Sequence, residues 1–393
     1  MAEISKHLFD SVCRDLHCSE IVHPWTKSCF DVCSILQFFI GSAKFYLVVH
    51  LVQNLLKGKI FKTREDVRRA LEYYLRSTLL GALVCSTSVS GACFFRWLLG
   101  RRFNYYTYIF IPNMLNGLFI MLEPPSRRGL VVNLFCNMVV EYWLRSLEQT
   151  GWIRITKLKM TFLFMLGSSL LFYLMRLEGE KEKRTPLLWL YTPEKVKLKA
   201  PGENPCPHSG PCSKYILKGT AAYFSAGLAF TVVNLVQPLL KSPLTTLSSL
   251  GGKHLKLAMF LGSYIGIYRL SICWLCHKRG SDSAAHALPA GALAGLSFLF
   301  KPSLGVAIAA LSGAFKIFST TMYEKKMITE KVDLPLMLYC LSQGTLFHAR
   351  CMHPQACPSY VFNLMKSVSN GYIYNFSKID LVVWALKSNK KNR

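Results

Sequence analysis

Two stretches of the sequence are nearly the same: VVHLVQNLLK at residues 48–57 and VVNLVQPLLK at residues 232–241. Eight of the ten positions are identical at a constant offset of 184. Two fainter parallels follow in the same order. Gly117-Leu118 to Glu123-Pro124 matches Gly295-Leu296 to Lys301-Pro302, and Leu171-Phe172 with Arg176 matches Leu346-Phe347 with Arg350. Because self-similarity at a long period marks a repeated architecture, the sequence predicts an internal duplication.

The composition favours a membrane environment for both copies. Of 393 residues, 51% are hydrophobic and 17% are charged, against about 25% charged in typical soluble domains. This excludes a disordered or fibrous chain, and a soluble chain of this length would have to bury most of its surface. The formal net charge of +26 comes from basic residues that lie between apolar runs. There they would meet anionic lipid headgroups, so we expect membrane lipids and no nucleic acid as partners.

A helix that crosses a bilayer needs about 20 mostly apolar residues. We therefore predict an all-α fold, a polytopic membrane bundle of about ten helices built from two internal repeats. The candidate spans lie near residues 34–56, 79–99, 105–122, 130–147, 158–175, 215–240, 255–276, 284–300, 303–322 and 336–348.

The predicted organisation follows from these spans. It has a Cys-containing N-terminal segment (1–30), a first membrane repeat (31–177), a polar linker (178–213), a second repeat (214–350) and a basic tail (351–393). We expect neither a cleavable signal peptide nor a transit peptide. Five spans per repeat would invert the second copy, and four would keep it parallel to the first. We favour five, which places the linker and the C-terminus on opposite sides of the membrane.

Small residues recur every four positions in three of the predicted helices, which lets helix backbones approach closely. The glycines among them are Gly262, Gly266, Gly291, Gly295, Gly305 and Gly313. We interpret them as helix-packing sites, since a conducting path would also need a polar lining.

A polar stripe on the fourth span is the main candidate for a functional surface. Asn133, Asn137 and Glu141 recur every four residues, so they share one helix face. A buried ionisable group in a membrane span suggests function, but pairing of Glu141 with Arg145 one turn on is the structural alternative.

Three further basic residues have two interpretations each. Arg127 and Arg128 open the same helix, where they would either anchor it to phosphates or bind a specific anionic lipid or partner. Lys44 interrupts the first span, and it would either extend to the membrane surface or line a cavity.

The 14 cysteines do not form a disulfide framework. We interpret four of them, in apolar runs, as small core residues: Cys85, Cys93, Cys136 and Cys340. Two groups could offer soft ligands to zinc, the first of Cys13, His17, Cys18, His23, Cys29 and Cys33, the second of Cys206, His208 and Cys212. Their spacing is irregular, so we favour free thiols over a metal site or a disulfide. Cys273 to His277 has the Cys-x-x-Cys-His spacing of haem attachment, but it lies at the end of a predicted span, and we expect no haem and no other cofactor.

Several motifs resemble the transmembrane protein 135 family. In the second half they are Phe260-Leu261-Gly262-Ser263 with Ile267-Tyr268-Arg269, and the run from Ala290 to Ser297. In the first half Ser126-Arg127-Arg128-Gly129 with Asn137, Glu141 and Arg145 is similar to the family's arginine-anchored helix. Trp25 and Cys29 resemble its cysteine-rich start, and Pro358-Ser359-Tyr360 its late loop. The linker is shorter than the family's and has fewer cysteines, and the tail is truncated.

The resemblance implies a polytopic protein of peroxisomes and mitochondria, tied to mitochondrial fission and to lipid metabolism, with organelle-division proteins among its partners. The glycine-rich helices are also similar to the inner-membrane protein translocase superfamily. A transporter or channel for lipid, metabolite or polypeptide is the alternative function. The chain has no Walker loop, nucleophile elbow or zinc-protease helix, so we expect no enzyme. The terminal Lys390-Lys391-Asn392-Arg393 is similar to an endoplasmic-reticulum retrieval signal, which makes that organelle the third candidate location.

Overall fold

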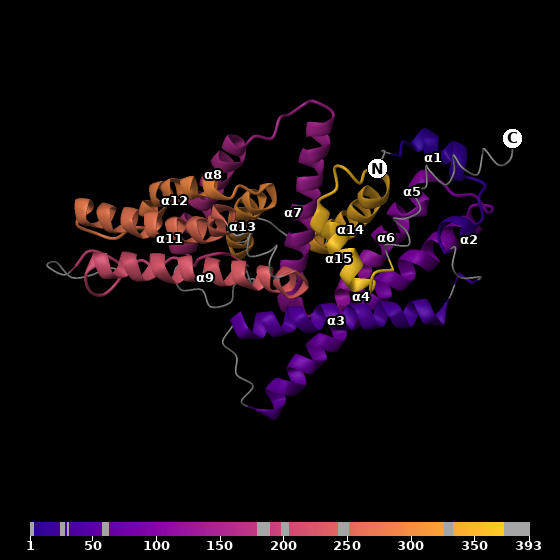
Figure 1. The fold of residues 1–393 in the computed structure, drawn as a ribbon, viewed down its shortest axis with the longest axis horizontal. Coiled ribbons are helices and arrows are strands. Elements are labelled where there is room, and N and C mark those ends of the chain that lie inside the picture. Colours follow the sequence, from indigo (N-terminus) through magenta and orange to yellow (C-terminus); the bar gives the residue numbers. More distant parts are fainter. Residues whose placement is uncertain are drawn as a thin grey trace. The chain divides into compact units, whose positions relative to one another are not determined.

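The computed structural model describes residues 4–23, 28–29, 31–56, 63–178, 189–197, 204–242, 251–325 and 333–372. The tail beyond Tyr372, with its paired lysines, lies outside them. Within these ranges the chain is all-helical and has no strands (Figure 1). The elements are α1 (Lys6–Cys13), α2 (Cys18–Ile21), α3 (Val32–Leu56), α4 (Arg64–Leu98), α5 (Tyr105–Tyr108), α6 (Phe110–Asn116), η1 (Gly117–Leu122), α7 (Pro125–Gln149), α8 (Lys157–Leu177), α9 (Cys212–Lys241), α11 (Gly252–Arg279), η2 (Ala284–His286), α12 (Ala287–Gly295), η3 (Leu296–Phe300), α13 (Leu304–Glu324), α14 (Leu334–Met352) and α15 (Ser359–Val368).

The long helices begin at capping residues that the sequence supplies. Thr63 and Thr156 precede α4 and α8, and their side chains accept hydrogen bonds from Asp66 N and Lys159 N. Asp333 accepts a hydrogen bond from Leu336 N at the start of α14, where a proline occupies the first turn. Such caps satisfy amide groups that have no partner within the helix, so they fix where each helix starts.

The chain folds into two compact units. Unit 1 comprises Met1–Ile153 and Glu330–Arg393, and unit 2 comprises Arg154–Thr329. In unit 2, α11 packs against α9, α12 and η3, while α8 packs against α12 and α13. The core of unit 2 is aromatic, with the Phe164 and Phe298 rings stacked at 4.1 Å and Tyr264 donating a hydrogen bond to Ser168 Oγ at 2.8 Å.

Unit 1 has the same pattern of helix contacts. Its α4 packs against α3, α6 and η1, while α14 packs against α6, η1 and α7. The N-terminal segment joins this unit, because Phe9 is fully buried against Tyr105 and Tyr108 and Ile4 N donates a hydrogen bond to Met352 O. Helix α15 closes unit 1 against α3.

The units do not coincide with the two repeats read from the sequence. Helix α8, the fifth span of the first repeat, belongs to unit 2, and α14, the fifth span of the second repeat, belongs to unit 1. Glycines hold both helices in place. A Cβ on Gly295 would lie 2.6 Å from Met165 Cα on α8, and a Cβ on Gly117 would lie 2.6 Å from Cys340 Cα on α14. The boundaries expected at 177 and 214 therefore do not separate the compact units.

Six described helices are long and apolar enough to cross a membrane: α3, α4, α8, α9, α11 and α13. The chain is thus a multi-pass membrane protein, with fewer qualifying spans than the ten we expected. The third candidate is broken into α5, α6 and η1, with Pro112 in α6, and the eighth into η2, α12 and η3. The fourth and tenth candidates lie in α7 and α14, which fall short by the same criteria.

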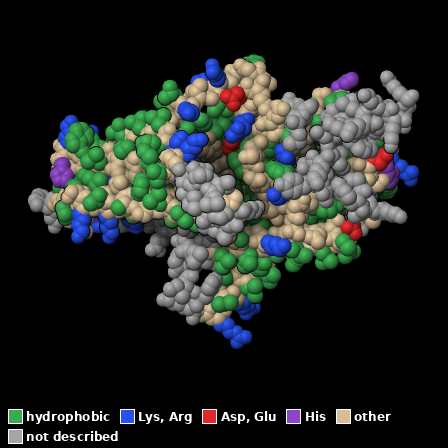
Figure 2. Space-filling view, in the orientation of Figure 1, with side chains coloured by type: hydrophobic (Ala, Val, Ile, Leu, Met, Phe, Trp, Pro, Cys, Tyr) green, Lys and Arg blue, Asp and Glu red, His purple; other side chains and the backbone are tan. Residues whose placement is uncertain are grey.

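Large hydrophobic side chains remain exposed on the outer faces of these helices. Trp97 on α4, Phe162 on α8 and Phe315 on α13 are each about 68% exposed. Figure 2 shows hydrophobic side chains spread over much of the visible face of both units. Exposure of so much apolar surface to water is unfavourable, so these faces are suited to contact with lipid tails.

Candidate metal centres

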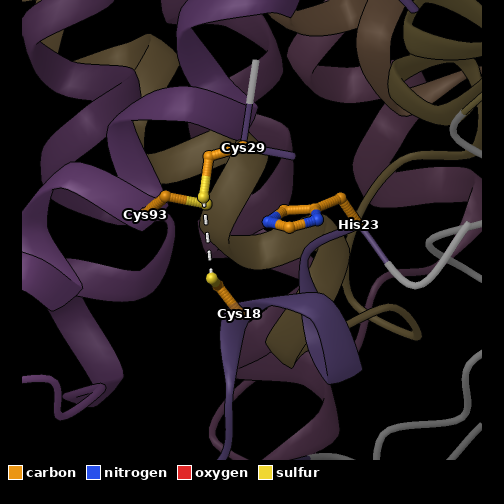
Figure 3. A group of neighbouring side chains, drawn as sticks. All are labelled: Cys18, His23, Cys29 and Cys93. Carbon is orange, nitrogen blue, oxygen red and sulfur yellow. Dashed lines mark hydrogen bonds between the residues drawn. The ribbon is translucent and has the colours of Figure 1, made fainter. Parts of the chain in front are cut away.

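Four potential metal ligands converge at the N-terminal edge of unit 1. Cluster 1 consists of Cys18 on α2, His23 and Cys29 in the segment that leads to α3, and Cys93 near the end of α4. Their ligand atoms all lie within 4.8 Å of one another, and the Cys18 and Cys29 sulfurs are 3.6 Å apart. In Figure 3 the imidazole of His23 faces the three sulfurs. Cys18, His23 and Cys93 are buried.

A second group with the same ligand types lies in unit 2. Cluster 2 consists of Cys206 and His208 in the segment before α9, Cys212 at the first residue of α9, and Cys273 near the end of α11. The Cys206 and Cys212 sulfurs are 3.6 Å apart, and His208 Nε2 lies 3.3 Å from Cys273 Sγ. The His208 ring stacks on Tyr215 at 4.0 Å, which fixes its orientation.

The two clusters have the same order along the chain. Each takes Cys, His and Cys from the stretch that ends at the start of α3 or α9, and its last Cys from near the end of the next long helix, α4 or α11. Those last ligands, Cys93 and Cys273, are related by a sequence offset of 180. The glycines that follow α4 and α11, Gly100 and Gly280, have the same offset, and both adopt the left-handed conformation, with φ of 68° and 69°. Each chain segment therefore turns at a left-handed glycine as its helix ends, at the C-cap of α11 and one residue past the C-cap of α4.

Burial and neighbouring thiols raise the pKa values of two cluster cysteines outside the membrane spans, Cys206 and Cys18. Burial raises the pKa of the Cys206 thiol to about 11, and the neighbouring Cys212 adds to the effect. Burial, together with Cys29, likewise raises the pKa of Cys18. A set of thiols in this state is protonated at neutral pH, so it is poorly suited to act as a nucleophile.

Residues 15–146 match the family model for the N-terminal cysteine-rich region of Transmembrane protein 135. Over these residues the chain is similar to the transmembrane protein 135 family. The matched residues include all four ligands of cluster 1, as well as the arginine-anchored start of α7. No solved structure matches the chain.

A third group of potential ligands has a different character. Cys276, Asp282 and His286 also place their ligand atoms within 4.8 Å of one another. Both oxygens of Asp282, however, accept hydrogen bonds from Arg176 at 2.6 Å. A cation already neutralises this carboxylate, so the group is a weaker candidate for a metal than the clusters. Cys273 lies in cluster 2, whereas Cys276 lies in this third group.

The sequence predicted part of each cluster. Cys18, His23 and Cys29 come together as members of the first group, whereas Cys13, His17 and Cys33 are not part of cluster 1. Cys206, His208 and Cys212 all belong to cluster 2. Sequence reasoning missed the last cysteine of each cluster, because it took Cys93 for a core residue and read Cys273 only within the haem-like motif. The signal that could have found both is the offset of 180 between Cys93 and Cys273, which also separates Gly100 from Gly280.

The polar stripe of α7 is built around one buried carboxylate. Glu141 is 2% exposed, and its Oε1 accepts a hydrogen bond from Arg145 Nη2 at 2.7 Å. Its Oε2 accepts a hydrogen bond from the hydroxyl of Tyr360 on α15. Asn133 and Asn137 are half-buried on the same helix. The arrangement ties α7 to α15 within unit 1.

The other basic candidates lie in three different settings. Arg128 donates hydrogen bonds to the carbonyls of Glu123 and Met121, so it caps the end of η1. Arg127 lies 2.9 Å from His50 Nε2 and 3.9 Å from Glu123 Oε2. Lys44 is exposed on α3.

The predicted packing glycines lie at or near helix contacts of unit 2. A Cβ on Gly266 would lie 2.6 Å from Thr220 Oγ1, and one on Gly262 would lie 3.0 Å from Phe224 Cβ, both on α9. Gly291 faces α8, where a Cβ would lie 2.8 Å from Ser168 O. On α13, Gly313 is buried and Gly305 is half-buried.

Proposed function

We propose that this membrane protein regulates mitochondrial and peroxisomal dynamics and lipid metabolism from the membrane of one of these organelles. The match of residues 15–146 to the transmembrane protein 135 family supports the proposal, because the resemblance described above implies this role. Membrane lipids, including anionic headgroups, and organelle-division proteins are the proposed partners. A catalytic role is not part of the proposal.

The pairing of ionisable side chains inside the units is the observation that favours a regulatory role over transport. Glu141 pairs with Arg145, Arg176 with Asp282, and Arg269 with Glu194, at 2.7, 2.6 and 3.3 Å. A transport site usually presents charged groups to its cargo, and charges that neutralise one another hold helices together instead. We keep a transporter or channel as the second candidate because the Asn133–Asn137–Glu141 stripe shares one face of α7.

Imaging of the tagged protein together with lipidomics of a knockout would test the proposal. We expect the tag on peroxisomes or mitochondria, with altered organelle number or length and altered lipid composition in the knockout. Tag signal confined to the endoplasmic reticulum, with normal organelles in the knockout, would contradict it. Uptake of a solute by vesicles that contain the purified protein would favour the second candidate.

We further propose that the two units arose by duplication and that five helices per copy make the second copy inverted. The sequence parallels and the matching helix contacts support this. Protease-sensitive tags in the linker and after Arg393 should then become accessible on opposite sides of the membrane. Equal accessibility of both tags before permeabilisation would contradict the inverted arrangement.

A further inference from the structure

We propose that cluster 1 and cluster 2 each bind one Zn²⁺ ion through three cysteine thiolates and one histidine. This goes beyond the proposed function, since a role in organelle membranes requires no metal. The two ions would be structural, because four protein ligands leave no open position for a substrate.

The distances between the ligand atoms fit one tetrahedral ion. With Zn–S bonds of about 2.3 Å, two sulfurs on the same zinc lie about 3.8 Å apart, and a sulfur and a nitrogen lie about 3.6 Å apart. The Cys18–Cys29 and Cys206–Cys212 sulfurs are 3.6 Å apart, and His208 Nε2 is 3.3 Å from Cys273 Sγ. These sulfur pairs are too far apart for a disulfide, whose sulfurs lie about 2.0 Å apart.

The same distances argue against an iron–sulfur cluster. A two-iron cluster distributes its four ligands over two metal ions, so some ligand pairs would be separated by more than about 5 Å. In both clusters every pair of ligand atoms lies within 4.8 Å. Three thiolates and an imidazole around a single ion are a ligand set typical of zinc.

The surroundings suit the charge of the occupied sites. One Zn²⁺, three thiolates and a neutral imidazole carry a net charge of −1, after three thiol protons have left. Arg96 lies one turn beyond Cys93 on α4, and its Nε donates a hydrogen bond to Leu16 O, two residues before Cys18. His277 lies one turn beyond Cys273, and its Nδ1 is 3.4 Å from Cys206 Sγ. Nearby basic groups of this kind stabilise metal-bound thiolates.

The same arrangement of ligands occurs in both units. The matched order of ligands, the common offset of 180 between Cys93 and Cys273, and the left-handed glycines Gly100 and Gly280 all place them at corresponding points of the two units. The third group has no such counterpart, because the same offset relates Cys276 and Asp282 to two arginines, Arg96 and Arg102. Chance crowding of thiols would not repeat a four-ligand set in this way.

Each ion would link the stretch that precedes α3 or α9 to the end of the next long helix, α4 or α11. In cluster 1 the bridge from Cys29 to Cys93 encloses all of α3 and most of α4. In cluster 2 the bridge from Cys212 to Cys273 encloses α9 and most of α11. A metal bridge that closes such a long loop restricts the unfolded chain and so stabilises the folded unit.

The test is the zinc content of the full-length protein, purified in detergent without a polyhistidine tag and washed with a weak chelator. Elemental mass spectrometry should find about two zinc ions per chain. Cys93→Ser and Cys273→Ser should each lose about one ion, and the double variant about two. Cys85→Ser and Cys276→Ser are matched controls on the same two helices, and both should keep the wild-type content.

Cobalt replacement provides a readout that does not depend on how well the variants fold. The wild-type protein loaded with Co²⁺ should show intense sulfur-to-metal charge-transfer bands and the visible bands of tetrahedral cobalt. One zinc ion or none per wild-type chain, an octahedral cobalt spectrum, or a Cys18–Cys29 or Cys206–Cys212 disulfide in the purified protein would each overturn the proposal.

Discussion

The two units use an arginine at the same place in different ways. Arg176 in the last turn of α8 and Arg350 in the last turn of α14 are parallel positions in the sequence. Each of these two helices lies in the unit that is formed mainly by the other half of the chain. Arg176 is 2% exposed and binds both oxygens of Asp282. Arg350 is half-buried, and its guanidinium lies 4.1 Å from the ring centre of Phe362.

The difference originates in one loop. Asp282 follows Gly280 after α11, whereas Arg102 stands at the corresponding position after α4 and pairs with Asp15 at an exposed site. The loop of unit 2 therefore provides a buried partner for Arg176, and the loop of unit 1 provides a second cation. Equivalent positions of the two units thus carry different charges, whereas cluster 1 and cluster 2 have the same ligand types.

Replacement of the two arginines, Arg176 and Arg350, should reveal the largest difference in stability between equivalent positions of the two units. Arg176→Met leaves the buried Asp282 without its cation, and we expect a loss of about 3–5 kcal/mol of stability. Arg350→Met removes an aromatic contact and should cost only about 1 kcal/mol. Thermal unfolding of both variants in the same detergent would measure the difference, and equal losses would contradict the assignment of Arg176 and Asp282 as a buried pair.

The Glu141→Gln variant tests the buried carboxylate of α7 in unit 1. In unit 2, helix α13 carries only Lys316 and Glu324 as charged residues. Loss of the carboxylate weakens the hydrogen bonds from Arg145 and Tyr360 and should cost about 1.5–3 kcal/mol. Thermal unfolding and cellular abundance would measure this loss. Tyr360→Phe removes one of these bonds and should cost less. Reduced function of Glu141→Gln at wild-type stability would instead support the transport alternative.

Gly291→Ala tests the close approach of α12 to α8 in unit 2. The new methyl group would lie 2.8 Å from the Ser168 carbonyl oxygen, so the helices must separate, at a cost of about 1–3 kcal/mol. Gly252→Ala is the control, since a Cβ there has no atom within 4 Å. Thermal unfolding should distinguish them, and unchanged stability of Gly291→Ala would show that this contact is looser than described.

The sequence predicted the helical class and the membrane setting, and it grouped three of the four residues of each cluster while favouring free thiols over a metal site. The helical class and the membrane setting followed from the hydrophobic runs, because a long apolar run in lipid forms a helix. The fourth ligands were missed because Cys93 and Cys273 lie near the ends of helices, far along the chain from their partners, where a lone cysteine looks like any small core residue. The placement of α8 and α14 was missed because the parallels reveal which helices correspond, but not which unit each joins.

The central claim is that each unit contains the fifth helix of the other half, and contacts of two methionines test it directly. Met165 on α8 lies beside Gly295 of α12, and Met114 on α6 lies beside Gly344 of α14. Protein grown with photo-methionine and irradiated in native membranes should yield, by mass spectrometry, crosslinks from Met165 to the α12 peptide and from Met114 to the α14 peptide. Crosslinks from Met165 to the α6 peptide, or from Met114 to the α8 peptide, would place each fifth helix in its own half and contradict the account.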